Sequence, residues 1–169
     1  MIEMKVAGIA LDAATRSPIV LLRDASERRA LPIFIGQEQA KSIIGALEDH
    51  SPPRPLTHDL FVGMMESWEM DLDRIIIHSL QDNTFYAVLV VSKGEVKKEL
   101  DARPSDAIAI ALRTDSPIWV MEEVVMEASI PVDREADEAE RQAFREFIEN
   151  VSPDDLIRQA ELRKKDEAQ

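Results

Sequence analysis

The chain has 169 residues, of which 45% are hydrophobic and 31% charged, and this composition is typical of a soluble globular domain with a sizeable core. The absence of cysteine excludes disulfides, thiolate metal sites and a cysteine nucleophile. The net charge of −13 argues against tight binding to duplex nucleic acid, which normally needs clustered lysine and arginine, and its simplest role is solubility. The first residues do not form a secretory signal and no apolar run approaches the roughly 20 residues of a membrane span, so we expect a cytoplasmic protein without membrane contact.

The first third of the chain predicts three strands followed by a helix. Residues 5–11, 19–22 and 29–35 are apolar or alternating and are separated by short polar turns, a pattern typical of an antiparallel meander. Pro32 indicates an edge position or an irregular end for the third strand, because proline cannot donate to the hydrogen-bond ladder. Residues 37–47 carry apolar side chains at helical spacing and predict the first helix.

A stiff, proline-rich connector then leads to a second helix. The connector reads Asp49-His-Ser-Pro-Pro-Arg-Pro55, and the helix is predicted over residues 58–70 with Thr57 as its N-cap. Large apolar side chains form one stripe along this helix, and we assign that stripe to the core: Leu60, Phe61, Met64, Met65 and Trp68.

Three more strands are predicted over residues 72–79, 84–92 and 95–101, joined by polar hairpin turns. The third of them alternates and favours a position near the edge of a sheet. A helix follows directly, so the order of three strands and a helix occurs twice. The sequence therefore predicts an α+β fold in which duplicated three-strand-plus-helix units form a mixed or antiparallel sheet covered by helices.

The domain built from these units is predicted to cover residues 1–130, and it ends with a short strand and a short helix over residues 116–120 and 122–129. Residues 131–169 are predicted to form an acidic helical C-terminal extension. That extension has too few large apolar side chains for a core of its own.

A polar corner precedes the helix that follows the sixth strand, in the sequence Asp101-Ala-Arg-Pro-Ser-Asp-Ala-Ile-Ala-Ile-Ala-Leu-Arg113. Pro104 fits the first turn of a helix, and Ser105 or Asp106 is expected to cap the free amides there. The apolar run 107–112 predicts a buried helix. Four polar side chains at the mouth of this helix must therefore satisfy one another or be used: Asp101, Arg103, Ser105 and Asp106.

His58 and Asp59 are adjacent at the start of the second helix. Histidine is the only side chain that titrates near neutral pH without help, and with a carboxylate beside it it can act as a general acid or base. Neighbouring residues on a helix face different ways, so a joint site has to recruit groups from elsewhere, for example from the corner at 101–106. The competing interpretation is a helix cap next to a surface histidine.

Four carboxylates lie at the ends of predicted elements, and they form an oxygen-rich set of the kind that can hold Mg²⁺ or Mn²⁺: Glu38, Asp59, Asp101 and Asp106. Arg54 and Arg103 can bind either a phosphate or these carboxylates. The alternative is an arginine–aspartate network that only holds the corner together. No Walker loop, dinucleotide glycine motif or Gly-x-Ser-x-Gly elbow occurs, which argues against a nucleotide cofactor.

Four motifs follow one another along the chain. They read Leu31-Pro-Ile-Phe-Ile-Gly36 with Glu38 and Ala40, Arg54-Pro-Leu-Thr-His-Asp-Leu60, Asp82-Asn-Thr-Phe-Tyr-Ala87 and Asp101-Ala-Arg-Pro-Ser-Asp-Ala-Ile-Ala109. Together they resemble the bifunctional nuclease family, also called the domain of unknown function 151 family. The resemblance covers roughly residues 3–130. It implies an α+β fold that self-associates and an enzyme that degrades RNA and DNA.

By this resemblance we expect a nuclease that hydrolyses phosphodiester bonds of single-stranded RNA or DNA, assisted by Mg²⁺ or Mn²⁺, in a homo-oligomer whose simplest form is a dimer. Three residues are expected to be catalytic: His58, Asp59 and Asp106. Three are expected to bind substrate: Arg54, Arg103 and Ser105. Three are expected to hold the metal ion: Glu38, Asp59 and Asp106. The rival hypothesis is a non-enzymatic acidic oligomeric scaffold or regulatory protein whose polar corner is structural. An open cavity containing both His58 and Asp106 would favour the nuclease. A polar corner sealed from solvent would favour the non-enzymatic rival.

Overall fold

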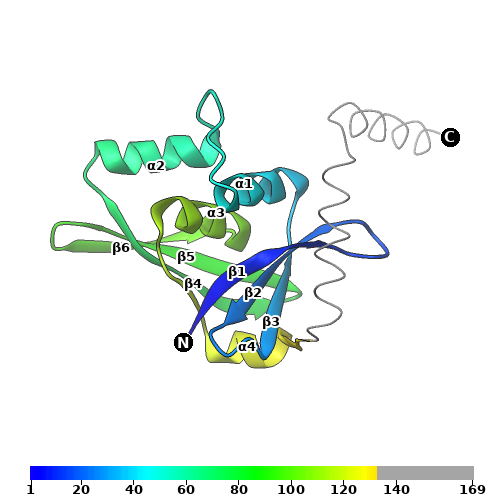
Figure 1. Ribbon diagram of the computed structural model, residues 1–169. Coiled ribbons are helices and arrows are strands. Elements are labelled where there is room, and N and C mark those ends of the chain that lie inside the picture. The colour runs from blue at the N-terminus through cyan, green and yellow to red at the C-terminus, as the bar shows by residue number, and fades with distance from the viewer. Residues whose placement is uncertain (133–169) are drawn as a thin grey trace. The chain divides into compact units, whose positions relative to one another are not determined.

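The computed structural model describes residues 1–132, which form one eight-stranded mixed sheet with four helices (Figure 1). The strands are β1 (Ile2–Leu11), β2 (Pro18–Asp24), β3 (Arg29–Phe34), β4 (Asp71–Gln81), β5 (Thr84–Lys93), β6 (Val96–Ala102), β7 (Ile118–Val120) and β8 (Ile130–Pro131). The helices are α1 (Gln37–Leu47), α2 (Thr57–Ser67), α3 (Pro104–Thr114) and α4 (Glu122–Ala128). The predicted α+β class is confirmed.

The sheet contains the two predicted three-strand units side by side, in the order β6-β5-β4-β7-β1-β2-β3-β8. Within each unit neighbouring strands are antiparallel. The short strand β7 joins the units, because it pairs in parallel with β4 and antiparallel with β1. β6 lies at one edge of the sheet, as its alternating sequence predicted. Pro32 also lies toward the margin, because β8 pairs with β3 only at Arg29 and Ala30.

Helix α3 is the centre of the helical layer. It packs on β4 and β5, while α1 and α2 pack on α3, and Figure 1 shows these three helices together on one side of the strands. Every residue from Ala107 to Ala111 is buried, so the predicted buried helix is confirmed. Alanines at alternate positions of this segment leave room for close packing on both sides.

The assignment of the apolar stripe of α2 to the core was largely wrong. Met65 is 2% exposed, whereas Met64 is 47% exposed and Trp68 66% exposed. The reason is the layer in which α2 lies: its main partner is α3 and not the sheet, so only a narrow side of the helix is covered. Periodicity predicted a helix correctly, but it did not show how much of the apolar face would be covered.

The start of α2 also differs from the prediction. Thr57 is the first helical residue, and the N-cap is Leu56, whose backbone amide donates to Asp59 Oδ2 at 2.8 Å. The carboxylate of Asp59, the third helical residue, therefore accepts the backbone amide of the N-cap residue, as the acidic residue of a capping box does. This contact fixes the backbone immediately before His58.

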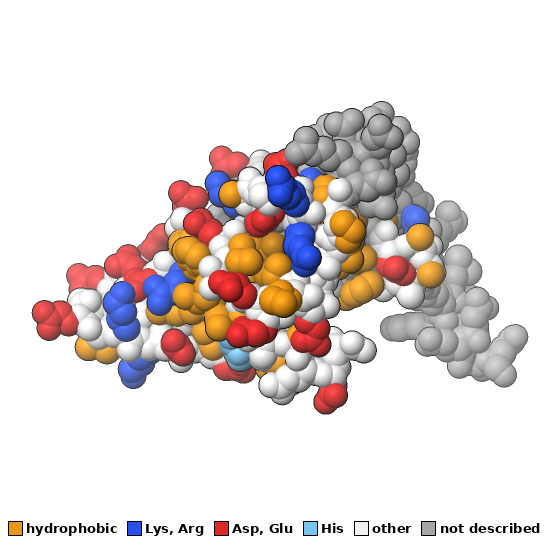
Figure 2. All heavy atoms as spheres, turned by 90° about the horizontal axis from the view of Figure 1, so that it is seen from below, with side chains coloured by type: hydrophobic (Ala, Val, Ile, Leu, Met, Phe, Trp, Pro, Cys, Tyr) orange, Lys and Arg blue, Asp and Glu red, His pale blue; other side chains and the backbone are white. Residues whose placement is uncertain are grey.

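Figure 2 shows the molecule from below, with apolar side chains gathered in the middle of that face and acidic and basic side chains around them. None of the helices within residues 1–132 is long and apolar enough to cross a membrane. The predicted boundary after residue 130 falls inside β8, which pairs with β3. The predicted acidic helical extension at 131–169 lies almost wholly outside the described residues, and the domain division stays a prediction.

Candidate functional site

A cavity of about 980 Å³ in the helical layer opens to solvent, and it is larger than a neighbouring cavity beside Asp59 and Arg113. It lies between α1, α2 and the first two turns of α3, with Leu89 in the middle of β5 and the end of β6 on the remaining side. Each of these elements contributes to its wall, and the polar side chains there are Glu38, Gln39, Ser42, Thr57, His58, Asp101, Arg103 and Asp106. Three of the four residues of the polar corner predicted from the sequence, Asp101, Arg103 and Asp106, therefore form one side of an open cavity.

His58, Asp106 and Arg103 form a chain of hydrogen bonds along this wall. His58 Nε2 lies 3.0 Å from Asp106 Oδ1, and Arg103 Nε donates to Asp106 Oδ2 at 2.6 Å. The first two side chains are mostly buried, whereas the Arg103 side chain is 68% exposed. The arrangement places an imidazole against a carboxylate, with a guanidinium reaching into solvent beside them.

On the other side of the ring, His58 Nδ1 lies 2.8 Å from Ser42 Oγ. Burial raises the pKa of Asp106, but the hydrogen bonds from Arg103 and His58 outweigh this effect and hold the pKa below its ordinary value. Asp106 is therefore an anion at neutral pH and accepts the Nε2 proton of His58. In the neutral imidazole Nδ1 then carries the lone pair and accepts the hydroxyl proton of Ser42.

The capping role expected for Ser105 or Asp106 was wrong. The N-cap of α3 is Arg103, which makes no side-chain cap hydrogen bond, and Pro104 occupies the first turn as predicted. The carboxylate of Asp106 is engaged by His58 and Arg103 instead. Ser105 is buried in the first turn and lies on the wall of neither cavity, so the structure does not bring it to the predicted substrate site.

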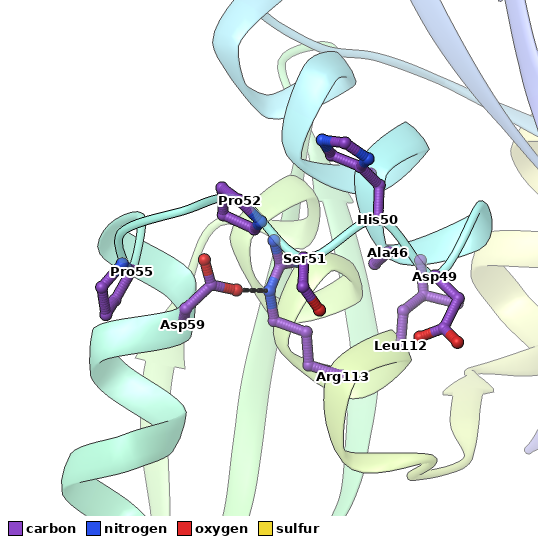
Figure 3. A pocket seen from close by; sticks show the side chains of 10 residues that line it. Ala46, Asp49, His50, Ser51, Pro52, Pro55, Asp59, Leu112 and Arg113 are labelled. Atoms are coloured by element: carbon purple, nitrogen blue, oxygen red, sulfur yellow. Dashed lines mark hydrogen bonds and ion pairs between the residues drawn. The ribbon is translucent and has the colours of Figure 1, made fainter.

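Asp59 lies on a second cavity, of about 410 Å³, together with Arg113 (Figure 3). Arg113 Nε donates to Asp59 Oδ1 at 2.6 Å, and this hydrogen bond is the main cause that lowers the pKa of Asp59. In Figure 3 the two side chains point toward each other from α2 and α3, while the ring of His50 points away. His58 and Asp59 thus face different cavities, as expected for neighbours on a helix.

Of the other predicted site residues, Glu38 lies on the larger cavity and Arg54 on neither. The Glu38 side chain is well exposed and pairs with Lys41 at 2.8 Å, one turn along α1. Arg54 is exposed in the connector before α2. The structure therefore brings together Glu38, His58, Arg103 and Asp106 from the predicted set and leaves Arg54, Asp59 and Ser105 elsewhere.

The three carboxylates predicted to hold a metal ion do not form one group. Asp59 lies on the smaller cavity and is engaged by Arg113, whereas Glu38 and Asp106 lie on the larger one. Among residues 1–132, no three histidine, aspartate or glutamate side chains are placed to hold an ion together. The set does not fit a shared Mg²⁺ or Mn²⁺ in this arrangement, and use of either ion stays a prediction.

Sequence reasoning missed two residues of this region, Ser42 and Arg113. Ser42 follows the apolar pattern of α1 and is only 5% exposed, yet its hydroxyl contacts His58 on another helix. Arg113 Nη1 donates to the backbone carbonyl of Ser42 at 3.2 Å and to that of Ala109 at 2.8 Å. The sequence shows Ser42 as a serine among apolar helix residues and Arg113 as a basic residue in the last turn of a helix. Neither pattern indicates which side chain or carbonyl the residue will contact.

The family model of the bifunctional nuclease domain matches residues 20–133 of the chain. The chain belongs to the bifunctional nuclease domain family. The resemblance carried by the four sequence motifs is thus confirmed. Every residue that lines the larger cavity falls within the matched range, so the cavity is part of the bifunctional nuclease domain itself.

Two groups of relatives differ in how much of the chain they share. Uncharacterized proteins of two Mycobacterium tuberculosis strains are 40% identical to it over 162 residues, covering 91% of this chain and 97% of the relative. Bifunctional nuclease 1 of Oryza sativa is 30% identical over 112 residues, covering 64% of this chain and 34% of the rice protein. The mycobacterial relatives therefore share nearly the whole chain, whereas the match to the rice protein covers about two thirds of this chain and one third of that protein.

Proposed function

We propose that this protein is a nuclease that hydrolyses phosphodiester bonds of single-stranded RNA or DNA in the larger cavity. The observation that carries the proposal is the hydrogen-bonded chain of His58, Asp106 and Arg103 on the wall of a cavity open to solvent. An open cavity with both His58 and Asp106 is the outcome expected for a nuclease. The family, and the name of the rice relative, support the same reaction.

Each of the three side chains has a distinct role in the proposed reaction. His58 acts as general base and then as general acid, because a neutral imidazole can take up and return a proton near neutral pH. Asp106 orients the ring through Nε2 and stabilises the imidazolium that forms. Arg103 binds the phosphate with the exposed part of its guanidinium, while Asp106 holds its Nε.

The size and charge of the molecule favour a single strand over a duplex. The net charge of −13 repels a rigid polyanion over long range. A flexible single strand can place one phosphate beside Arg103 while its other phosphates stay in solvent. A cavity of about 980 Å³ is within the usual size range of sites for small ligands and can hold a nucleotide.

The test is cleavage of labelled single-stranded oligonucleotides by the purified full chain, with Mg²⁺, with Mn²⁺ and with a chelator. His58→Ala and Asp106→Asn should each lower kcat by about 100-fold or more, since general acid–base catalysis contributes about 10²–10⁴-fold. His78→Ala is the matched control, because His78 lies on β4 and not on the cavity. Unchanged activity in a folded His58→Ala/Asp106→Ala double variant would contradict the assignment.

The rival hypothesis predicts a different set of results. A scaffold or regulator in which the polar corner only stabilises the fold would cleave no oligonucleotide under any of these conditions. Asp106→Ala would still lower its melting temperature. The expected homo-oligomer and the cytoplasmic location stay predictions alongside the nuclease, as does assistance by a divalent ion.

A further inference from the structure

We propose that Ser42 is the nucleophile of this site and that cleavage passes through a covalent intermediate in which a nucleotide is attached to Ser42 Oγ. This inference rests on the proposed nuclease function and deepens it, because it replaces a water molecule by a side chain in the first step. It concerns a residue that none of the sequence motifs singled out.

The first support is the position of the hydroxyl. Ser42 on α1, His58 on α2 and Asp106 on α3 form one continuous series of hydrogen bonds on the cavity wall, with distances of 2.8 Å and 3.0 Å at the two ring nitrogens. A serine inside a helix commonly donates to the carbonyl four residues earlier, as Ser67 does to Gly63 at 2.7 Å. The hydroxyl of Ser42 instead reaches across to another helix.

The second support is the direction of the hydrogen bonds. Because the Asp106 carboxylate can only accept at Nε2, Nδ1 is the ring nitrogen of His58 that is left to act as a base, and Ser42 Oγ lies against it. The proton that His58 is placed to remove is therefore that of Ser42. A water molecule would first have to displace either Ser42 or Asp106 from the ring.

A serine, a histidine and an aspartate in this order form the arrangement that activates serine in hydrolases. The two ring nitrogens have exchanged roles, since serine more often faces Nε2 and aspartate Nδ1. The exchange preserves the chemistry, because one nitrogen still receives the hydroxyl proton while the other is held by the carboxylate.

The third support is the fixation of Ser42 itself. Arg113 Nη1 donates to the backbone carbonyl of Ser42 at 3.2 Å, and the same side chain holds Asp59, the residue after His58. Arg113 is thus a positioning residue that ties the helix carrying the nucleophile to the helix carrying the base. Arg103, bound to the far oxygen of Asp106, supplies positive charge for the phosphoryl group on the open side.

In the first step Ser42 Oγ attacks phosphorus and forms an Oγ–P bond while its proton moves to His58 Nδ1. The P–O bond to the leaving nucleoside breaks, and the leaving oxygen takes that proton from His58. In the second step water attacks the same phosphorus, His58 Nδ1 takes one proton of the water, and the Oγ–P bond breaks. Ser42 Oγ then recovers the proton, leaving one hydroxyl end and one phosphomonoester end.

The absence of cysteine from the chain provides a direct test, because Ser42→Cys introduces the sole thiol. A thiol beside His58 should form a thiolate below its ordinary pKa and react with iodoacetamide at pH 6.5 at least about tenfold faster than the thiol of Ser67→Cys. Adding His58→Ala to Ser42→Cys should remove the excess rate. Equal rates in Ser42→Cys and Ser67→Cys would overturn the proposal.

A second arm uses the natural hydroxyl and a fluorophosphonate probe, which loses fluoride to an activated serine. Mass spectrometry should find the adduct on the Ser42 peptide of the wild type and of Ser67→Ala, but not on Ser42→Ala. A wild-type protein that stays unlabelled at Ser42 would overturn the proposal.

Cleavage assays then separate this inference from the proposed function. Ser42→Ala should lower kcat on single-stranded oligonucleotides by about 1,000-fold or more, as expected for loss of a nucleophile, with KM nearly unchanged. Cleavage at the wild-type rate by folded Ser42→Ala would overturn the role of Ser42 and leave the nuclease in place. Absence of cleavage by the wild type would overturn the nuclease, and the labelling at Ser42 would still decide whether its hydroxyl is activated.

Discussion

Arg113 and Asp59 form a mostly buried ion pair that joins the end of α3 to the start of α2, with Nε and Oδ1 2.6 Å apart. The same guanidinium donates to the backbone carbonyl of Ser42 in α1. One side chain therefore links the three helices that enclose the larger cavity, although it does not line that cavity.

Removal of this side chain should destabilise the fold. Arg113→Ala is expected to lower the free energy of unfolding by about 1–3 kcal/mol, because it removes the donor to Asp59 Oδ1 and to the backbone carbonyl of Ser42. Urea titration followed by circular dichroism measures the change. Lys41→Ala is the control, since its pair with Glu38 is exposed and should contribute less than about 1 kcal/mol. Equal losses in the two variants would contradict the linking role of Arg113.

The strands were predictable from the sequence, whereas the contacts of Arg113 with the other helices were not. Strands and turns follow local patterns, so the two three-strand units and the helix after each were predicted correctly. Neighbouring residues on a helix face different ways, so His58 was expected to find its partner in the corner at 101–106 and not in Asp59. The hydrogen bond to Asp106 agrees with that expectation. The contacts of Ser42 with His58 and Arg113 span 16 and 71 residues, and no local pattern encodes which helices will meet.

Acid should weaken the fold through Asp59. The hydrogen bond from Arg113 lowers its pKa in the folded state below the ordinary 3.8, so the unfolded chain binds the proton more readily. The stabilisation is therefore complete above the ordinary pKa and is lost as the pH falls below it through the folded value. Between pH 7 and pH 3, the wild type should lose more free energy of unfolding than Asp59→Asn loses.

The matched control for this pH dependence is Arg113→Ala, which keeps Asp59 but removes its main hydrogen-bond donor. Its free energy of unfolding should depend on pH less than that of the wild type does, because the pKa of Asp59 returns toward its ordinary value. Parallel pH profiles for the wild type and both variants would show that Asp59 does not contribute to the acid sensitivity.

Arg103 and Arg54 should differ in their effect on binding, although the sequence assigned phosphate binding to both. Arg103 lies on the cavity wall and Arg54 on neither cavity. Arg103→Ala should weaken binding of a labelled single strand by about tenfold or more, the loss expected for a charge-assisted hydrogen bond, and should reduce the salt slope by about 0.7. Arg54→Ala should change the affinity by less than about threefold, the scale of a weak surface contact.

Fluorescence anisotropy at several salt concentrations measures both affinities and both slopes. Arg103 also holds Asp106, so each variant is first checked for an unchanged melting temperature. A larger loss in Arg54→Ala than in Arg103→Ala would place the strand along the proline-rich connector and not in the larger cavity.

Met64 and Met65 are neighbours in α2 with opposite surroundings, and they test the outer position of this helix. Met65 is 2% exposed, so Met65→Ala should lower the free energy of unfolding by about 2–5 kcal/mol through the cavity that it leaves. Met64 is 47% exposed, so Met64→Ala should change it by less than about 0.5 kcal/mol. Urea titration of both variants at low protein concentration measures the difference. A large loss in Met64→Ala that grows with protein concentration would show that a second copy of the chain covers this face of α2.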